Sequence, residues 1–385
     1  MTGRVMARWK PHGRRLLLGC VTVGLTGFTA TSLFDPRIVH DDAWDRWVIS
    51  FEARPESAFL QRQYVLVSTS ENACGSYFRY VFDVKLTSDT SEFWDFPDLG
   101  LTQDSVIITA NRFFGLTNAG SAAFGMAKAN VYNGLGFRGA LFTGLGRTLA
   151  PPIVLDGNPC ASLLQNLDAT HLARRVFCNS GNPGYEFLSA PASILVSTPI
   201  AVPANARQPG CSATSSCSLD TSDARFSSQT WQYFDNLWAA HTIAFNPSIG
   251  SFLPTPKYYD IDIFGLGINT VKQQAFFFNN SGLPDDFNAS IAARPNGTIY
   301  VSWNASGPFN FVQVRVGGKV TGCAFSQALV NLSTATLTGN FDPRFGSQRW
   351  GDYSNTWLDN SFSMIHPGSV GGLVRWRTAL GCCLS

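Results

Sequence analysis

The sequence predicts an all-β protein, and three observations lead to that class. Hydrophobic residues make up 45% of the 385 residues and charged residues only 14%, against roughly 25% charged in ordinary soluble domains. The chain also holds 35 Gly, 20 Pro and 30 Phe, so it is rich in turns and in aromatic side chains. Short runs of Val, Ile, Phe, Tyr and Thr alternate with Gly, Pro, Asn and Asp, which is the pattern of strands and turns.

The strands follow one another along the whole chain. They are predicted at 34–39, 46–53, 63–70, 77–84, 105–113, 122–132, 173–178, 192–200, 237–245, 258–267, 291–303, 311–320 and 355–378. The hairpin at 291–303 is the clearest, because Asn296-Gly297 is the preferred two-residue type I′ turn. One segment, 160–175, has the apolar spacing of a modest helix.

A repeated phrase indicates the architecture. Trp, Asp and an aromatic residue occur together at 94–96 and again at 350–353, and "FDPR" occurs at 34–37 and 341–344. An Asp followed by a short strand, a polar turn and a stronger strand is found at Asp35, Asp95, Asp286 and Asp352. A unit of strands that recurs at roughly 45 to 65 residues is typical of propeller blades. We therefore expect a single β-propeller of about six blades, five to seven, with a large β-sandwich as the alternative.

The first 33 residues differ from the rest. Five basic residues precede an apolar run at 16–30 that ends in small residues, as in a secretory signal. The sequence therefore predicts a signal peptide or N-terminal anchor segment over 1–33 and a propeller domain over 34–385. A fragment of an upstream strand is the alternative. The run is too short for a confident membrane span, so no transmembrane domain is expected in the mature chain.

Cysteine usage agrees with export to an oxidising compartment. Eight Cys lie outside the N-terminal segment, and no Cys-x2-Cys spacing indicates zinc. We expect one local disulfide between Cys211 and Cys217 and a second between Cys160 and Cys178. The first lies in a Ser- and Pro-rich stretch at about 198–229, interpreted as a surface insertion. The predicted location is secreted or cell-surface.

The wording "FDPRIVHDDAWDRWVIS", then "FWDFPDLGLTQDSVIITANRF", then "RWGDYSNTW" resembles exported bacterial proteins of undetermined function that look like β-propellers. The resemblance covers most of the chain from Phe34 onward in pattern. It implies a propeller and an extracytoplasmic place. It implies no activity and no catalytic residues, and this chain departs from the pattern before "FDPR", where such proteins have more strand-forming sequence.

Several side chains are candidates for chemistry or binding. The carboxylates that we considered for acid–base work are Asp95, Asp98, Asp235, Asp352 and Glu186. His241 is the one His inside an apolar strand, and Trp238 and Trp350 are candidates for sugar stacking. The wider set of Trp candidates for surface or channel positions adds Trp44, Trp47, Trp94 and Trp231. Structural roles compete with each of these: turn hydrogen bonds for a repeated Asp, and core packing for His and Trp.

The functional prediction is an exported, monomeric propeller that binds a glycan or a cell-surface protein, or serves as a surface scaffold. The alternative is a hydrolase or lyase on polysaccharides, with carboxylates or His241 in the central channel. The net charge of +2, with scattered basic residues, gives no case for nucleic acid. No motif supports Ca²⁺, and no other cofactor or metal is predicted.

Overall fold

The structure is a computed structural model that describes most of the chain from residue 33 onward. The described residues are 33–54, 56–136, 139–179, 185–188, 191–246, 252–265, 269–276, 285–320, 323–358, 364–367 and 373–376. The predicted signal or anchor segment therefore lies outside the described residues, apart from Leu33. The chain divides into two compact units. Unit 1 comprises Met1–Gln165 and Arg175–Pro191, and unit 2 comprises Asn166–Arg174 and Ala192–Ser385.

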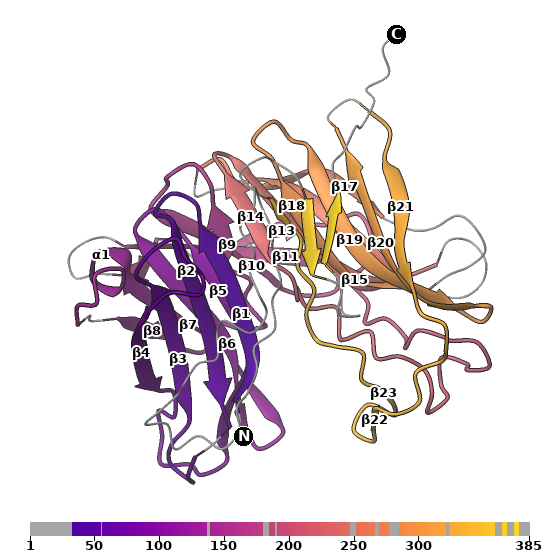
Figure 1. The fold of residues 1–385 in the computed structure, drawn as a ribbon, viewed down its shortest axis with the longest axis horizontal. Coiled ribbons are helices and arrows are strands. Elements are labelled where there is room, and N and C mark those ends of the chain that lie inside the picture. Colours follow the sequence, from indigo (N-terminus) through magenta and orange to yellow (C-terminus); the bar gives the residue numbers. More distant parts are fainter. Residues whose placement is uncertain are drawn as a thin grey trace. The chain divides into compact units, whose positions relative to one another are not determined.

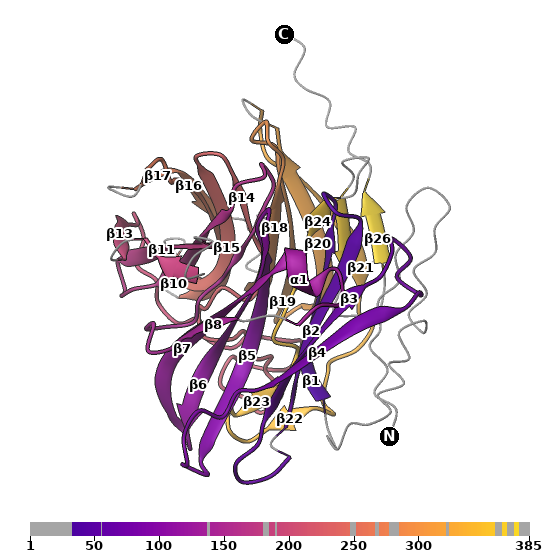
Figure 2. The same cartoon turned by 90° about the vertical axis from the view of Figure 1, so that its left-hand side faces the viewer.

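Unit 1 begins with two sheets in which consecutive strands pair in antiparallel order (Figures 1 and 2). The first sheet contains β1 (Leu33–Asp41), β2 (Arg46–Ala53), β3 (Arg62–Ser68) and β4 (Tyr77–Asp83). The second contains β5 (Glu92–Leu101), β6 (Ser105–Phe114), β7 (Thr117–Ala127) and β8 (Ala140–Phe142), with β9 (Pro152–Val154) parallel to β5. A four-residue helix, α1 (Lys128–Val131), follows β7. The remaining strands are β10 (Cys160–Asn166), the second half of β11 (His171–Asn179) and β12 (Tyr185–Phe187).

Unit 2 repeats this arrangement. The first half of β11 pairs with β13 (Ala192–Leu195). The next sheet segment contains β14 (Thr230–Tyr233), β15 (Asn236–Phe245), β16 (Leu253–Asp262) and β17 (Thr270–Phe276). Another four-stranded sheet contains β18 (Asp285–Ala293), β19 (Ile299–Gly307), β20 (Asn310–Lys319) and β21 (Ser326–Leu332). Shorter strands complete the unit: β22 (Phe341–Asp342), β23 (Ser347–Gln348), β24 (Trp357–Leu358), β25 (Met364–Pro367) and β26 (Leu373–Trp376).

The predicted all-β class is confirmed. Within the described ranges α1 is the one helix, and nearly all other regular structure is antiparallel strand. In the sets β1–β4, β5–β8, β14–β17 and β18–β21 every strand pairs with its neighbour in the chain. This order is found in propeller blades and lacks the crossovers of a Greek-key sandwich.

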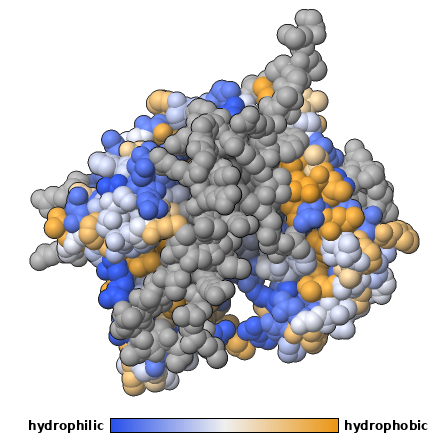
Figure 3. Space-filling model, in the orientation of Figure 1, coloured by the Kyte–Doolittle hydropathy of each residue, from blue (hydrophilic) through white to orange (hydrophobic). Residues whose placement is uncertain are grey.

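Buried aromatic and branched side chains form the cores between sheets. In unit 1 one cluster gathers around Ile107, Leu163 and Phe177, and another around Phe51 and Tyr64. The outer strand β21 of unit 2 has an alternating pattern with exposed side chains. Figure 3 shows hydrophobic surface on this side of unit 2. In the part of the chain that the structure describes, no helix is long and apolar enough to cross a membrane.

The helix predicted at 160–175 is wrong. The chain forms β10 and the start of β11 there, with a turn between them in which the Asp168 carboxylate accepts the backbone N–H groups of Thr170 and His171. Residues 161–166 of β10 are all buried. A strand buried on both faces has a continuous apolar run, and such a run also matches a helical spacing.

The hairpin predicted at 291–303 exists, but its turn is longer than two residues. Ala293 pairs with Ile299, so the turn spans 294–298. The N–H of Gly297 donates to the carbonyl of Arg294, and Gly297 has φ 78°. A type I′ turn needs a positive φ at both Asn296 and Gly297, and of the two only Gly297 has one, as the left-handed residue of a longer loop.

The segment at 198–229 is more buried than a surface insertion. Ala206 and Leu219 form a β-bridge and are fully buried. Further along the chain, Gln348 exchanges backbone hydrogen bonds with Ser218 and Asp220. The segment therefore contributes Ala206 and Leu219 to the core of unit 2, while other residues of it, such as Val202, are exposed.

Candidate functional site

A β-bulge recurs in the first strand of several sheets. In β1 the pairing with β2 shifts within 34–37, where Asp35 has φ 48°. In β5 the pairing with β6 shifts within 95–98, where Phe96 has φ 60°. Each bulge places two residues of the first strand opposite one residue of its partner and re-aims the neighbouring side chains.

Unit 2 contains the same feature in β18. The pairing with β19 shifts within 287–290, and Asn288 has φ 51°. Asp and Asn enter the left-handed region more readily than other non-glycine residues, whereas Phe96 does so at a cost of roughly 1–2 kcal/mol. Three first strands therefore share one backbone irregularity, at corresponding places.

Beside each bulge, the second strand carries a buried polar side chain. Glu52 of β2, Asn111 of β6 and Asn304 of β19 each pair with the residue that precedes the bulge. Their exposed fractions are 0%, 1% and 1%. Among the described residues, both Glu52 oxygens, both Asn111 amide atoms and Oδ1 of Asn304 have no hydrogen-bond partner. A buried polar atom without a partner costs about 1–3 kcal/mol, so these atoms require partners other than the described residues.

In unit 1 the two bulges are joined by an ion pair. Nη2 of Arg37, which follows the bulge of β1, lies 3.4 Å from Oδ1 of Asp98, which follows the bulge of β5. Nε of Arg37 donates to the carbonyl of Pro97 at 3.0 Å. The N–H of Leu99 donates to the same Asp98 oxygen at 2.9 Å, while Oδ2 of Asp98 has no partner among the described residues. We call Arg37, Glu52, Asp98 and Asn111 the bulge cluster.

Burial favours the protonated form of the carboxyls in the bulge cluster. It raises the pKa of Glu52 well above its ordinary value of 4.5, and the negative charges of Asp95 and Asp35 raise it further. Burial also raises the pKa of Asp98 to about 6, although the Arg37 charge and the Leu99 N–H oppose the shift. Groups with such shifts are overrepresented at functional sites.

The bulge cluster offers hydrogen bonds of both kinds. The amide of Asn111 and a protonated Glu52 each provide a donor and an acceptor, whereas ionised Asp98 provides acceptors only. Asp95 connects them, because it is the strand partner of Asn111 and its charge acts on Glu52. A hydroxyl group, which also donates and accepts, is the ligand chemistry that matches this set.

Asp95 and Asp98 are the sequence-predicted residues that the structure brings together. Oδ1 of Asp95 accepts the N–H of Phe96 at 2.9 Å and so stabilises the bulge. The repeated Asp therefore has the structural role that competed with catalysis. Asp98 belongs to the bulge cluster. Its Oδ2 has no partner among the described residues and therefore does not stabilise the bulge.

His241 and Trp238 lie on β15 of unit 2 and are both buried. Nδ1–H of His241 donates to the carbonyl of Ala224 at 2.8 Å, and Nε2 accepts from the Tyr259 hydroxyl at 2.9 Å. Burial lowers the pKa of His241 to about 3, so the ring is neutral. The Trp238 side chain donates to Asp260. These contacts favour a core role for both residues.

The other candidates lie elsewhere. In unit 2, Trp350 is half-buried against a cluster that contains Leu219 and Phe287, and Asp352 forms an ion pair with Arg349. Asp235 and Glu186 are exposed on a turn and on β12. In the wider set of Trp candidates, Trp44 is 53% exposed. The other three are buried: Trp47, Trp94 and Trp231.

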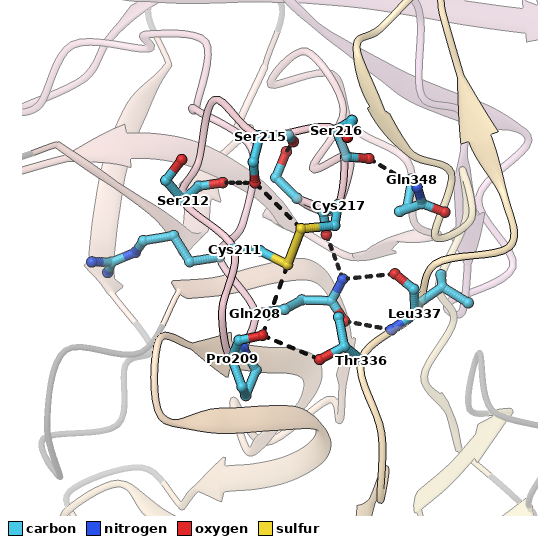
Figure 4. Close-up of a disulfide and its surroundings, with 12 residues drawn as sticks. Gln208, Pro209, Cys211, Ser212, Ser215, Ser216, Cys217, Thr336, Leu337 and Gln348 are labelled. Atoms are coloured by element: carbon cyan, nitrogen blue, oxygen red, sulfur yellow. Dashed lines mark hydrogen bonds between the residues drawn. A yellow bond between two sulfur atoms is a disulfide. The ribbon is translucent and has the colours of Figure 1, made fainter.

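Both predicted disulfides are present. Cys160–Cys178 lies in unit 1, with a Cα–Cα distance of 4.3 Å, and Cys211–Cys217 lies in unit 2, with 5.7 Å. Figure 4 shows Gln208 beside the second disulfide, where its amide group exchanges hydrogen bonds with the backbone of Leu337. Two disulfides are compatible with an oxidising compartment. Across the described ranges, no group of three or more His, Cys, Asp or Glu residues has the geometry of a metal site.

Comparison with known proteins does not assign a family. No family model and no curated protein matches the sequence. Among solved structures, a mutant of Trypanosoma rangeli sialidase with trans-sialidase activity matches at 11% identity, covering 97% of this chain and 57% of that one, with a TM-score of 0.43. The Hadza microbial sialidase Hz136 matches at 11% identity over 90% of this chain and 65% of its own, with a TM-score of 0.41. An endo-arabinase from Bacteroides thetaiotaomicron matches at 10% identity over 80% of this chain and 98% of its own, with a TM-score of 0.35.

The chain spans less than two thirds of the length of either sialidase. Similarity at this level does not transfer an activity. The functional argument therefore depends on the bulge cluster itself.

Sequence reasoning missed Arg37, Glu52 and Asn111. One signal was available in the sequence: Pro follows the left-handed residue in both "FDPR" and "DFPD". Pro lacks an N–H and is found in sheets at bulges and edges. That pattern marks the bulge, but the buried residue of the next strand becomes evident only from the register.

Proposed function

We propose that this chain is an exported, ligand-binding protein of propeller type, and that the bulge cluster of unit 1 binds a neutral glycan. The supporting observation is the set of buried polar atoms on Glu52, Asp98 and Asn111 that find no partner among the described residues. Water satisfies such atoms in the absence of a ligand. A sugar hydroxyl that replaces water offers the same donor and acceptor.

Charge favours a neutral ligand over an acidic one. Asp35 and Asp95 carry negative charges that act on Glu52, and the guanidinium of Arg37 is already paired with Asp98. A ligand carboxylate or phosphate would meet like charges at close range in a low dielectric, which is unfavourable. We therefore expect neutral oligosaccharides to bind and acidic ones to bind more weakly.

Architecture and location are part of the proposal. Six blades would be supplied by four sets of four consecutive strands, by β10–β13 and by β24–β26. The two disulfides and the N-terminal apolar run support export.

Isothermal titration calorimetry with a panel of neutral oligosaccharides and one acidic oligosaccharide tests the proposal. We expect the parent to bind a neutral member and Asp98→Asn and Asn111→Leu to bind it about tenfold or more weakly, because each loses a hydrogen bond worth about 1–3 kcal/mol. Asp342→Asn, at the end of β22 in unit 2, is the matched control and retains the parent affinity. Unchanged affinity in both cluster variants contradicts the proposal, as does a parent that binds no sugar but captures a protein.

A hydrolase is the second candidate, and the raised pKa of Asp98, about 6, favours it. A carboxylic acid with such a pKa can donate a proton near neutral pH, which glycoside hydrolysis requires. Release of reducing ends from the bound glycan, lost in Asp98→Asn, would support this function. Binding without any release of reducing ends rejects it and leaves the binding function in place.

A further inference from the structure

We infer that Trp44 forms a second glycan-binding place in unit 1, on the loop that joins β1 to β2. The loop residues 42–45 are all exposed, and Trp44 is 53% exposed. A single exposed aromatic residue is ordinary on a protein surface. This ring, however, is held in position by contacts with two other segments of unit 1.

The indole of Trp44 is fixed at two points. Its Nε1–H donates to the carbonyl of Gln103, on the neighbouring β5–β6 loop, at 3.2 Å. Its ring meets Tyr132 edge to face, with centroids 6.4 Å apart and an interplanar angle of 86°. The polar edge of the indole is thus satisfied within the protein, and half of its surface stays in water.

A buried ion pair stabilises the support beneath the ring. The Tyr132 hydroxyl donates to Oδ2 of Asp41 at 2.6 Å, and Nζ of Lys128 lies 2.5 Å from the same oxygen. Asp41, Lys128 and Tyr132 are all buried. Because the platform is already ordered, a ligand that stacks on Trp44 incurs little side-chain entropy cost.

Two exposed carboxylates lie in the same four-residue loop as Trp44 and indicate the ligand chemistry. The side chains of Asp42 and Asp45 are 48% and 58% exposed. His40 holds Asp42 in place, with Nδ1 2.5 Å from Oδ1. An apolar ring face beside hydrogen-bond acceptors matches a sugar, whose C–H face stacks while its hydroxyls donate. Asp42 and Asp45 outnumber the one guanidinium at this loop, Arg46, whose Nη1 donates to the carbonyls of Trp44 and Asp45. We therefore expect a neutral polysaccharide to bind better than an acidic one.

This place is separate from the bulge cluster. The bulge lies at the start of β1 and the Trp44 loop follows its end. Four residues of strand, 38–41, separate Arg37 of the cluster from the loop, a span of roughly 15 Å. The inference extends the proposed glycan binding to a second surface, and either site can bind without the other.

Affinity electrophoresis of the full chain in gels with soluble polysaccharides tests the inference. The panel contains neutral xyloglucan, galactomannan and arabinan, together with acidic polygalacturonate. We expect at least one neutral polymer to retard the parent, Trp44→Ala to weaken that binding about tenfold, and Trp44→Tyr to retain most of it. Phe309→Ala, which removes an aromatic residue that is 92% exposed in unit 2, is the matched control and binds like the parent.

Two results would overturn the inference: Trp44→Ala retarded as strongly as the parent, or a parent that no neutral polymer retards. Asp98→Asn is measured in the same gels. If Trp44→Ala loses binding and Asp98→Asn does not, the Trp44 site stands while the bulge cluster fails as a glycan site. The reverse pattern retains the bulge cluster and rejects the Trp44 site.

Discussion

Glu52 is a fully buried carboxyl of unit 1 whose pKa burial raises well above its ordinary value. It lies in β2, where every residue from Trp47 to Ala53 is buried. In such a strand the alternation of polar and apolar side chains does not mark an inner face, so sequence reasoning had no basis for selecting Glu52. Asp98, by contrast, follows closely after the repeated phrase at 94–96 and was among the candidate carboxylates. Repetition marks the bulges, and only the strand register identifies the residues opposite them.

The pH dependence of stability tests the protonation state of Glu52. Its pKa in the folded protein lies above the ordinary value of 4.5, so the folded state binds more protons than the unfolded state in the interval between the two. The free energy of unfolding therefore falls as pH rises from about 4.5 through the folded pKa. Glu52→Gln remains neutral and removes this part of the fall.

Urea unfolding of parent and Glu52→Gln between about pH 4 and about pH 8 measures the effect. We expect similar stability at the acidic end and a more stable variant at the basic end. In both proteins the titration of Asp98 lowers the free energy of unfolding by a further amount, about 3 kcal/mol, as pH rises. This amount follows from its pKa, which is raised from 3.8 to about 6 in the folded state. A constant difference between the two proteins across the range would show that Glu52 does not titrate as described.

At the scale of the element, the repeated phrase marks a bulge in β1, β5 and β18. The Asp residues of the phrase do not occupy the same position in each bulge. Asp35 is itself the left-handed residue, whereas Asp95 precedes Phe96 and accepts its N–H. The second "FDPR", at 341–344, forms β22 and an exposed turn instead of a bulged first strand. The same four letters adopt different structures because tertiary pairing, which is absent from the letters, selects the backbone.

Substitutions at Asp35 test the bulge geometry. Its φ of 48° is open to Gly at no steric cost, whereas a Cβ-bearing residue without a side-chain oxygen pays roughly 1–2 kcal/mol there. We expect Asp35→Ala to lower the free energy of unfolding by about that amount and Asp35→Gly to change it less. Chemical denaturation of both variants measures the difference. Equal destabilisation would mean that the Asp35 side chain, and not its backbone conformation, determines the effect.

At the scale of the molecule, the strands and turns were predictable and their grouping into two units was not. Strands depend on local composition, which the sequence displays, and the unit boundary at Gln165–Asn166 falls inside β10, where composition does not change. The prediction of one propeller over 34–385 stays a prediction. The disulfides were predictable because short Cys spacings in polar loops favour local pairing.

Removing each disulfide tests its share of the stability of its unit. Loop-closure entropy predicts about 3 kcal/mol for Cys160–Cys178, whose Cys residues are 18 apart, and about 2 kcal/mol for Cys211–Cys217, which are 6 apart. Paired Cys→Ser variants unfolded in urea give the two values. A larger loss for Cys211–Cys217 would show that its contacts with the 337–348 segment, and not loop closure, dominate.

The central claim is that the buried polar atoms of the bulge cluster take partners from outside the chain. The most direct measurement is a high-resolution crystal structure of the protein, without ligand and soaked with the neutral oligosaccharide that binds best. We predict ordered water within hydrogen-bond distance of Glu52, Asp98 and Asn111 in the free protein, and sugar hydroxyls in its place after soaking. A dry cluster in both crystals, with these side chains bonded to other protein groups, would contradict the account.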